Sequence, residues 1–491
     1  MSIAGSIEFS EETKSKDNLG PPEISHVFSP IHKISLDVLH EIFVFCLPVN
    51  PTMQSAGPVI LTLSLVSSTW RAAVISLPRL WSTLFVTVRY DDDLNKCAQV
   101  VNRWFQHARS APLSFFLNIR FRAYYEDITR IHNFLVDLSS IMLRVWHFGL
   151  HARLTKDLLR SFIDLDWKFP LLKILDLFSH AGYDKIREVA FSFPQPLFQN
   201  APDLVQVSIH NSITTFHDIQ DLLPWSQLRY LNIAYSISIS RWIEIMNMCP
   251  KLSRCIVVLK ELDVDSFLPE SICHNLKHLE FEINGCVPLL EPLSICNLPS
   301  LDTFGVLYNS TPSLGFSPGE ISALTNLRKF SFNRGRQKIS HEYLTQLTEV
   351  LREMVNLKVL ILQQTTKDFI PLYEALSFKS PGEPILPQLG TFNMWITTDS
   401  EVHLPEQDEE LDPLIEMLSS RIGEDSIPVG CKPLQKCIVG VEDDGIYERT
   451  KKRFDSLVGR LPPQFQFRIA VFRDFRFEQP DGWTYPISDV L

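Results

Sequence analysis

The sequence lacks the short signatures by which many functional sites are recognised. Its nine cysteines include no C-x-x-C pair, and no run approaches the ~18 apolar residues that a membrane-spanning helix needs. A glycine-rich phosphate loop, H-E-x-x-H, G-x-S-x-G and the protein-kinase signature are also missing. These absences argue against metal-binding, membrane and common enzyme classes. We therefore expect no catalytic residue, no cofactor and no metal ligand.

Blocks of positive charge are missing as well. The 491 residues carry a formal net charge of −11 and contain no long Lys/Arg block. Nucleic-acid binding usually depends on such basic patches, so a nucleic-acid partner is not expected. The odd number of scattered cysteines indicates a reduced chain in the cytoplasm, the nucleus or both. Cys255 and Cys437 fall in apolar positions of a repeat, where a thiol behaves as a small hydrophobic group.

What the sequence does contain is one phrase that recurs ten times. A Leu is followed by apolar residues three and five positions later, as in Leu172, Leu175 and Leu177. The first leucines of the phrases, spaced by 24 to 45 residues, are Leu172, Leu204, Leu228, Leu252, Leu276, Leu301, Leu327, Leu357, Leu389 and Leu434. A short strand recurring at about 25 residues predicts a leucine-rich-repeat α/β solenoid of horseshoe shape. Such folds present surfaces to partners.

The residues between these apolar positions form a candidate binding surface. Strand side chains alternate, so residues between the core positions should point outward. The outward residues mix aromatic, basic and acidic side chains, a composition that suits a protein interface. The candidate substrate-binding residues are Phe178, Tyr230, Glu280, Glu282, Lys329 and Trp395.

Composition and periodicity divide the chain into five parts. Polar residues without apolar periodicity predict a disordered N-terminal tail, and capping units are expected at both ends of a solenoid. The expected parts are a tail at 1–28, a small helical domain at 29–85, irregular capping repeats at 86–160, regular repeats at 161–460 with an exposed acidic insertion near 398–412, and an aromatic-rich C-terminal cap at 461–491.

The helical domain begins with a clear start signal. Ser35 can cap a first helix that carries apolar residues through Phe43. Prolines and glycine within 48–58 predict a loop, and the spacing within Leu63–Leu77 predicts one continuous helix that ends before Pro78. Later patterns predict helices over 91–108 and 343–354, the latter capped by Ser340, and strands over 84–88, 112–119 and 144–150.

Residues 29–85 resemble an F-box. The features that carry the resemblance, in order, are Ile34-Ser35, the helix pattern Leu39-x-x-Ile42-Phe43, a proline-rich loop, Leu65-Val66-x-x-x-Trp70-Arg71 and Pro78-x-Leu80-Trp81. Ile34-Ser35 stands where the family usually has Leu-Pro, and serine is also a competent helix start. An F-box followed by degenerate leucine-rich repeats is similar to the expanded F-box proteins of mushroom-forming fungi.

The resemblance implies a non-catalytic role in ubiquitin ligation. An F-box docks on the adaptor subunit of an SCF-type cullin-RING ubiquitin ligase and meets the cullin indirectly, while the repeats hold an unknown protein substrate. When the functional positions of the family are carried over residue by residue, the resemblance implies an adaptor-binding or helix-packing set. This set is Ile34, Leu39, Ile42, Phe43, Leu63, Val66, Trp70, Leu80 and Trp81.

Size supports an uncovered surface on this domain. A module of ~55 residues is too small to bury all of its large apolar side chains, so some should be left for a partner. Two alternatives remain open. The protein could be a leucine-rich scaffold whose helical domain packs internally and recruits no ligase, or it could bind the adaptor without the cullin.

Overall fold

The computed structural model describes residues 34–120, 125–152, 162, 165, 167–179, 198–210, 222–260, 272–284, 291–294, 296–308, 322–333, 340–363, 369–380, 382–396, 411–422, 427–441, 444–459 and 461–471. All structural statements concern these residues. The predicted tail at 1–28 and most of the predicted acidic insertion near 398–412 lie outside them.

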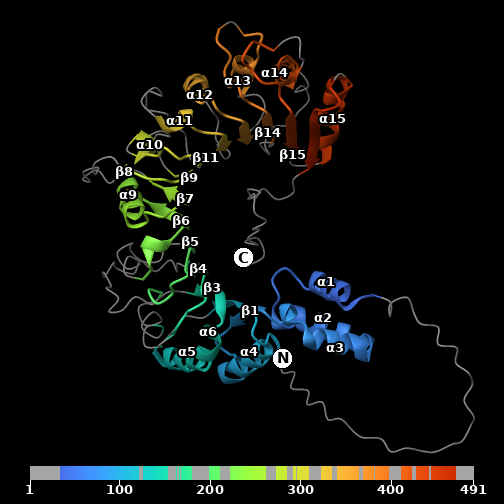
Figure 1. The fold of residues 1–491 in the computed structure, drawn as a ribbon, viewed down its shortest axis with the longest axis vertical. Helices are drawn as coiled ribbons and strands as arrows, with labels where there is room; N and C mark the ends of the chain where they lie inside the picture. Colours follow the sequence, from blue (N-terminus) through green and yellow to red (C-terminus); the bar gives the residue numbers. More distant parts are fainter. Residues whose placement is uncertain are drawn as a thin grey trace, which may run out of the picture.

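The described residues form a mixed α/β fold around one open, parallel sheet of fourteen strands. The strands follow one another in chain order, so each new strand pairs with its predecessor in the sheet. Figure 1 shows the sheet as an arc, with helices along its outer side. The strands are β1 (Thr83–Val88), β2 (Leu113–Ile119), β3 (Val145–Ala152), β4 (Ile174–Ser179), β5 (Gln206–His210), β6 (Tyr230–Ile237), β7 (Arg254–Leu259), β9 (His278–Ile283), β11 (Thr303–Tyr308), β12 (Lys329–Asn333), β13 (Val359–Gln363), β14 (Thr391–Ile396), β15 (Lys436–Val441) and β16 (Gln466–Val471). A separate pair joins β8 (Ile272–Cys273) to β10 (Cys296–Asn297).

Each of the ten predicted phrases produces one strand. The strand begins two residues after the first leucine of the phrase in every case, as for Leu172 and β4 or Leu434 and β15. All ten of these leucines are buried. The leucine is buried just before the strand begins. The next two apolar residues of the phrase lie on one face of the strand, because residues two positions apart in a strand point to the same side. The predicted strands at 84–88, 112–119 and 144–150 are also confirmed as β1, β2 and β3.

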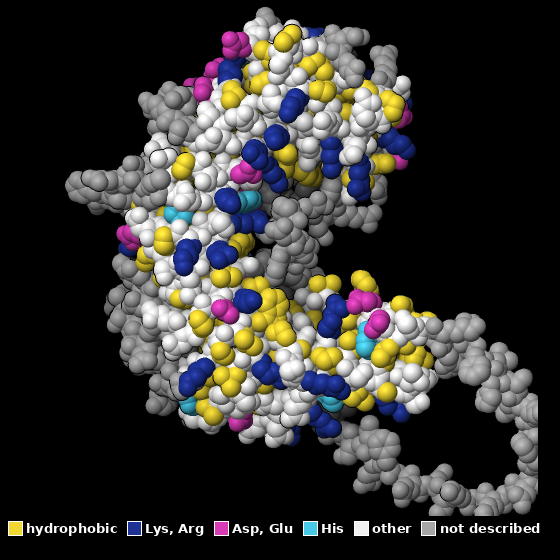
Figure 2. All heavy atoms as spheres, viewed as in Figure 1, with side chains coloured by type: hydrophobic (Ala, Val, Ile, Leu, Met, Phe, Trp, Pro, Cys, Tyr) yellow, Lys and Arg dark blue, Asp and Glu magenta, His cyan; other side chains and the backbone are white. Residues whose placement is uncertain are grey.

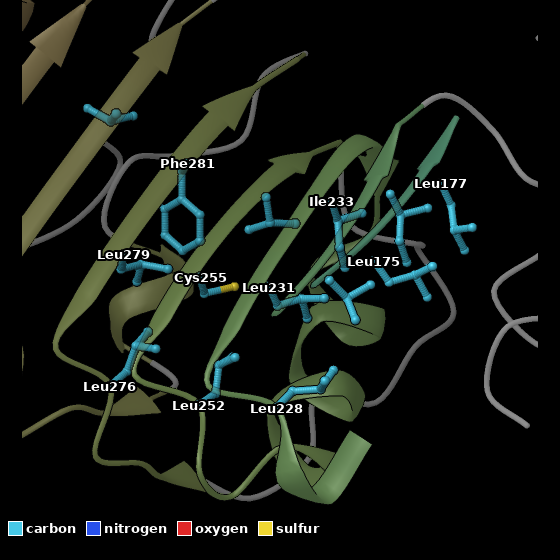
Figure 3. Close-up of a cluster of buried hydrophobic side chains, with 14 of the residues drawn as sticks. Leu175, Leu177, Leu228, Leu231, Ile233, Leu252, Cys255, Leu276, Leu279 and Phe281 are labelled. Carbon is cyan, nitrogen blue, oxygen red and sulfur yellow. The ribbon is translucent and has the colours of Figure 1, made fainter. Parts of the chain in front are cut away.

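The core lies between the sheet and the outer helices. Figure 3 shows side chains such as Leu231, Cys255 and Leu279, from neighbouring strands, pointing to the same side of the sheet. Cys255 and Cys437 are fully buried and free, as predicted, and burial raises the pKa of the Cys255 thiol to about 12. At neutral pH this thiol is protonated and acts as an apolar group.

Helices connect many of the strands. The predicted helices over 91–108 and 343–354 are confirmed as α4 and α12, and Ser340 caps α12 by accepting a hydrogen bond from the Tyr343 amide at 3.2 Å. After the first three helices come α4 (Leu94–His107), α5 (Tyr125–Asp137), α6 (Ser139–Met142), η3 (Trp225–Gln227), α9 (Ile239–Met248), α10 (Glu291–Ser294), α11 (Ser322–Thr325), α12 (His341–Glu353), α13 (Ile370–Leu376), α14 (Asp412–Ile422) and α15 (Asp444–Val458).

The N-terminal helices differ from the prediction in two places. The first helix, α1 (Leu36–Cys46), begins as predicted at the Ser35 cap. The predicted loop over 48–58 is wrong from residue 53 onward, because α2 (Met53–Val66) starts at a Thr52–Ser55 capping box and contains Pro58. The capping box satisfies amides at the helix start, and this local signal outweighs the proline.

The predicted single helix over Leu63–Leu77 is also wrong, because the chain breaks it at Ser67. Ser67 is extended, and its hydroxyl accepts a hydrogen bond from the Trp70 amide at 3.1 Å, so it caps a new helix, α3 (Ser68–Ser76). The apolar spacing continues across the break and therefore conceals it. A 3-10 turn, η2 (Pro78–Leu80), follows where the helix was predicted to stop.

Strands continue at both ends of the sheet, outside the ten phrases. The residues at 86–160 supply β2, β3 and half of β1, which belong to the same sheet and pair in register apart from one irregularity at Leu113/Ser114. The expected cap at 461–491 begins with β16, which pairs in parallel with β15. The sheet therefore extends beyond the ten phrases in both directions, because strand pairing needs β-prone residues in register rather than a repeated leucine.

Candidate functional site

The helical head, residues 34–82, buries part of its apolar side chains in a core that continues into the sheet region. Leu39 and Phe43 of α1 are buried against α3, where the Phe43 ring lies 4.9 Å from the Trp70 ring. Leu63 and Leu80 are buried as well. Of the predicted adaptor-binding set, these four aliphatic and aromatic side chains hold the head together and present no surface to a partner.

Three further members of the predicted set are partly buried. Ile34, Trp70 and Trp81 pack against the core with part of each side chain exposed. The Trp81 indole donates to the Val74 carbonyl oxygen at 3.0 Å and lies 4.9 Å from the Trp104 ring of α4. Trp81 therefore anchors the head on the first helix of the sheet region. The head is also tied to β1 by the Phe85 amide, which donates to the Pro51 carbonyl.

The remaining two members, Ile42 and Val66, are exposed, and they belong to a larger uncovered set. Val38, Ile42 and Phe45 recur at four- and three-residue steps, so they form one stripe along α1. Phe45 is 85% exposed. The exposed apolar set of the head consists of Leu36, Val38, Ile42, Phe45, Val49, Leu61, Leu65, Val66 and Ile75.

This set is concentrated in a small part of the chain. It supplies nine of the seventeen exposed large hydrophobic side chains among the described residues, from a segment of fewer than fifty. Figure 2 shows hydrophobic side chains on the visible face of the head, with charged side chains among them. An exposed apolar set of this kind favours an interaction site.

The same segment is almost free of charge. No Asp, Glu, Lys, Arg or His occurs from Ile42 to Trp70, which covers the last five residues of α1 and all of α2. The charged residues that bound this run in the sequence are Glu41, which pairs with Arg79 at 2.7 Å on the surface, and Arg71, whose Nε donates to the Ser64 carbonyl oxygen at 3.1 Å. A partner that covers the residues between them therefore desolvates few charged groups, and such desolvation would oppose binding.

Sequence reasoning found the head but missed most of its exposed surface. Leu36, Val38, Phe45, Val49, Leu61, Leu65 and Ile75 were not predicted. The signal that could have found them is the apolar stripe opposite Leu39 and Phe43 on α1, together with the charge-free run that follows it. A helix with apolar residues on both sides of its wheel must leave one side uncovered unless a second layer packs on it.

The second surface is the inner face of the sheet, defined as the face opposite the buried leucines. All six predicted substrate-binding residues lie on it, because each alternates with buried neighbours in its strand. They are not gathered at one point. Phe178 lies on β4, Tyr230 on β6, Glu280 and Glu282 on β9, Lys329 on β12 and Trp395 on β14.

Charged and aromatic groups from three neighbouring strands meet around Glu280. Its carboxylate lies 2.5 Å from His278 Nε2 and 3.6 Å from Arg254 Nη2, and the Arg254 guanidinium lies 5.4 Å from the centre of the Tyr230 ring. Burial alone would raise the pKa of Glu280, but the His278 hydrogen bond and the charges on His278, Arg254 and Lys329 lower it. Glu280 is thus ionised and held in place, and it organises the basic side chains around it.

Histidines lie against Phe178 on β4, which is four strands away from β9 in the sheet. Its ring stacks on the His210 ring at 4.0 Å and lies 3.8 Å from the His151 ring. Nearby, His147 Nε2 lies 2.7 Å from Asp176 Oδ2, and both side chains are buried. Phe178 is therefore largely committed to contacts within the sheet, which leaves it less available as an anchor for a partner.

The chain matches no protein-family model and no curated protein. Across the described ranges, no helix combines the length and apolar character needed to cross a membrane. The described part of the chain likewise brings together no group of three or more His, Cys, Asp or Glu side chains that could hold a metal ion.

Proposed function

We propose that the protein is a non-catalytic substrate-recognition subunit of an SCF-type ubiquitin ligase. In this proposal the head is an F-box that docks on the adaptor subunit, and the sheet region is a leucine-rich-repeat solenoid of horseshoe shape that binds a protein substrate. The observation that carries the proposal is the exposed, uncharged apolar set of the head.

Two features of the head support adaptor docking. Covering a Leu, Ile or Phe side chain contributes about 1.5–3 kcal/mol, so a few side chains of this set suffice for a stable interface before ordering costs are subtracted. The buried residues Leu39, Phe43, Leu63 and Leu80 supply a rigid support for that surface. A rigid surface loses little entropy on binding.

Substitutions on the exposed stripe of α1 test the proposal. Ile42→Asp with Phe45→Asp should reduce co-purification of the adaptor subunit with the full-length chain by at least tenfold, because burying two carboxylates at an apolar interface is costly. Both side chains are exposed, so the fold should be retained. Leu39 is unsuitable for this test because it belongs to the core of the head.

The matched control places the same charges elsewhere. Leu143→Asp with Val355→Asp alters two exposed apolar residues outside the head and should leave adaptor binding unchanged. If the intact chain folds and fails to bind the adaptor, the proposal is wrong and the alternative of a leucine-rich scaffold without a ligase is favoured. If the adaptor binds but cullin does not co-purify, the protein acts with the adaptor outside a ligase.

A further inference from the structure

The residue directly after the first leucine of each phrase lies at the edge of the sheet where the strands begin, and these residues form one continuous row. The backbone amide of each residue donates to the carbonyl of the preceding member, from Val205 to Lys173 at 3.1 Å through Gln435 to Gly390 at 2.8 Å. We call this the leading row. Its members are Lys173, Val205, Arg229, Ser253, Lys277, Asp302, Arg328, Lys358, Gly390 and Gln435.

The leading row is strongly basic in a chain whose net charge is negative. Five of its ten members are Lys or Arg, and its one acidic member, Asp302, lies 3.4 Å from Arg328. The side chains of Lys173, Arg229, Lys277 and Lys358 are exposed and make no ion pair with another described residue. Their charges are therefore not offset within the described part of the molecule.

The next row on the inner face strengthens the same charge. It contains Arg254, His278, Lys329 and Lys436, and no acidic residue. Apart from Asp302 of the leading row, the acidic residues of these described strands, Asp176, Glu280 and Glu282, lie farther along them. Charge is thus separated across the sheet, with bases at the edge where the strands begin. Figure 2 shows Lys and Arg side chains recurring along the arc.

We propose that the leading row binds an extended acidic polypeptide segment. The inference rests on the proposed function where it assigns that segment to the substrate, and it names the substrate's chemistry. Lys173, Arg229 and Lys277 directly precede β4, β6 and β9, which are every second strand of the sheet. Their positions are therefore spaced by roughly 10 Å, twice the distance between neighbouring strands. An extended polyproline-II segment brings every third residue onto one side at about 9 Å. A segment with Asp or Glu at every third position matches that spacing.

The charge pattern favours a polypeptide over a nucleic acid. A phosphate backbone carries a charge at every nucleotide and would also pass Asp302 and lie near the acidic residues deeper on the inner face. A polypeptide can place apolar or neutral residues at these points. Apolar side chains in the segment could also contact Tyr230, which lies between Arg229 and Arg254 at the edge.

The test measures binding of peptides to the full-length chain in the absence of the adaptor. The probe is a fluorescent peptide of roughly twelve residues, built from a Glu-Pro-Ala repeat, which spans the row from Lys173 to Lys358 at about 3.1 Å per residue. The repeats Gln-Pro-Ala and Lys-Pro-Ala, and a uridine oligonucleotide, are the comparison probes. We expect the acidic peptide to bind best and its affinity to fall as salt is raised.

A charge-reversal variant locates the site. Arg229→Glu, Lys277→Glu and Lys358→Glu together should weaken acidic-peptide binding by about tenfold or more, because attraction is replaced by repulsion. Arg103→Glu, Lys451→Glu and Lys452→Glu make the same change in net charge on exposed helical residues and should leave the affinity within about twofold.

Three results would overturn the inference: no acidic-peptide binding, binding that the leading-row variant retains, or preference for the oligonucleotide. None of them affects adaptor binding by the head. Conversely, loss of adaptor binding with retained acidic-peptide binding would remove the ligase assignment and leave the leading row as a peptide-binding surface.

Discussion

Arg421 on α14 carries a positive charge into the protein interior. Its side chain is almost fully buried, and it donates to three backbone carbonyls, those of Leu376 at 2.6 Å, Leu386 at 3.2 Å and Ile385. Its guanidinium lies 4.2 Å from the centre of the Phe378 ring. Burial lowers its pKa to about 10, so it stays charged at neutral pH. The carbonyls that it holds include that of Leu386, whose φ of 54° is unfavourable for leucine.

Replacing Arg421 should therefore be costly. Arg421→Met keeps an apolar stem but leaves three buried carbonyls without their donors, and we expect the free energy of unfolding to fall by roughly 3 kcal/mol or more. Urea denaturation measures the change. Arg421→Lys keeps the positive charge but not the planar guanidinium, so its free energy of unfolding should fall less than that of Arg421→Met. Equal stability of the Met variant and the parent would contradict this role.

Protonation of His210, on the inner face, should make the stability of the protein depend on pH. Its side chain is buried and stacks on Phe178, and burial lowers its pKa, with a smaller opposing effect of Asp176. The unfolded chain therefore binds a proton at His210 more readily than the folded chain does. The free energy of unfolding should be unaffected by this group above the ordinary histidine pKa of about 6.5 and should fall as pH drops below it.

The variant His210→Phe isolates this contribution. It keeps an aromatic ring against Phe178 and removes the ionisation, so its stability should fall less than that of the parent between pH 7.5 and 5.5. Thermal unfolding at several pH values measures the difference. His147, His151 and Asp176 lie nearby in both proteins, so only the difference between parent and variant reports on His210. Parallel pH profiles would show that His210 makes no such contribution.

At the scale of elements, short polar signals decide where helices start and stop in the head. Ser67 separates α2 from α3 although the apolar spacing runs through it. The break lets α3 turn and bring Trp70 onto Phe43. The ten strands from β4 to β15 in the large sheet follow a different signal, since each begins two residues after a buried leucine.

Removing the Ser67 cap should loosen α3. Ser67→Ala should cost about 1 kcal/mol, the usual value for a lost N-cap. Hydrogen exchange of the amides in Ser68–Ser76 should become faster. Ser340→Ala removes the equivalent cap of α12 and should leave exchange in the head unchanged. Unchanged exchange in α3 after Ser67→Ala would mean that tertiary packing alone holds this helix.

At the scale of the whole molecule, two surfaces of opposite character lie on one chain. The head, at one end of the arc in Figure 1, exposes apolar side chains without charge, and the leading row exposes bases along the sheet. The two are joined through β1, where Phe85 bonds to Pro51 and Trp81 contacts Trp104. An apolar surface and a basic surface favour different partners, which is what the two proposals above require.

The sequence by itself determined the ten strands, the buried leucines and thiols, and the Ser35 cap, because these depend on spacing within a few residues. It also located the head. Only the tertiary structure decided which apolar residues of the head remain uncovered. Leu39 and Phe45 are both apolar residues of α1, but only Leu39 is buried when α3 packs against this helix. The same holds for the leading row. Its bases are at least 30 residues apart in the chain and join one row only when backbone hydrogen bonds bring the strands into register.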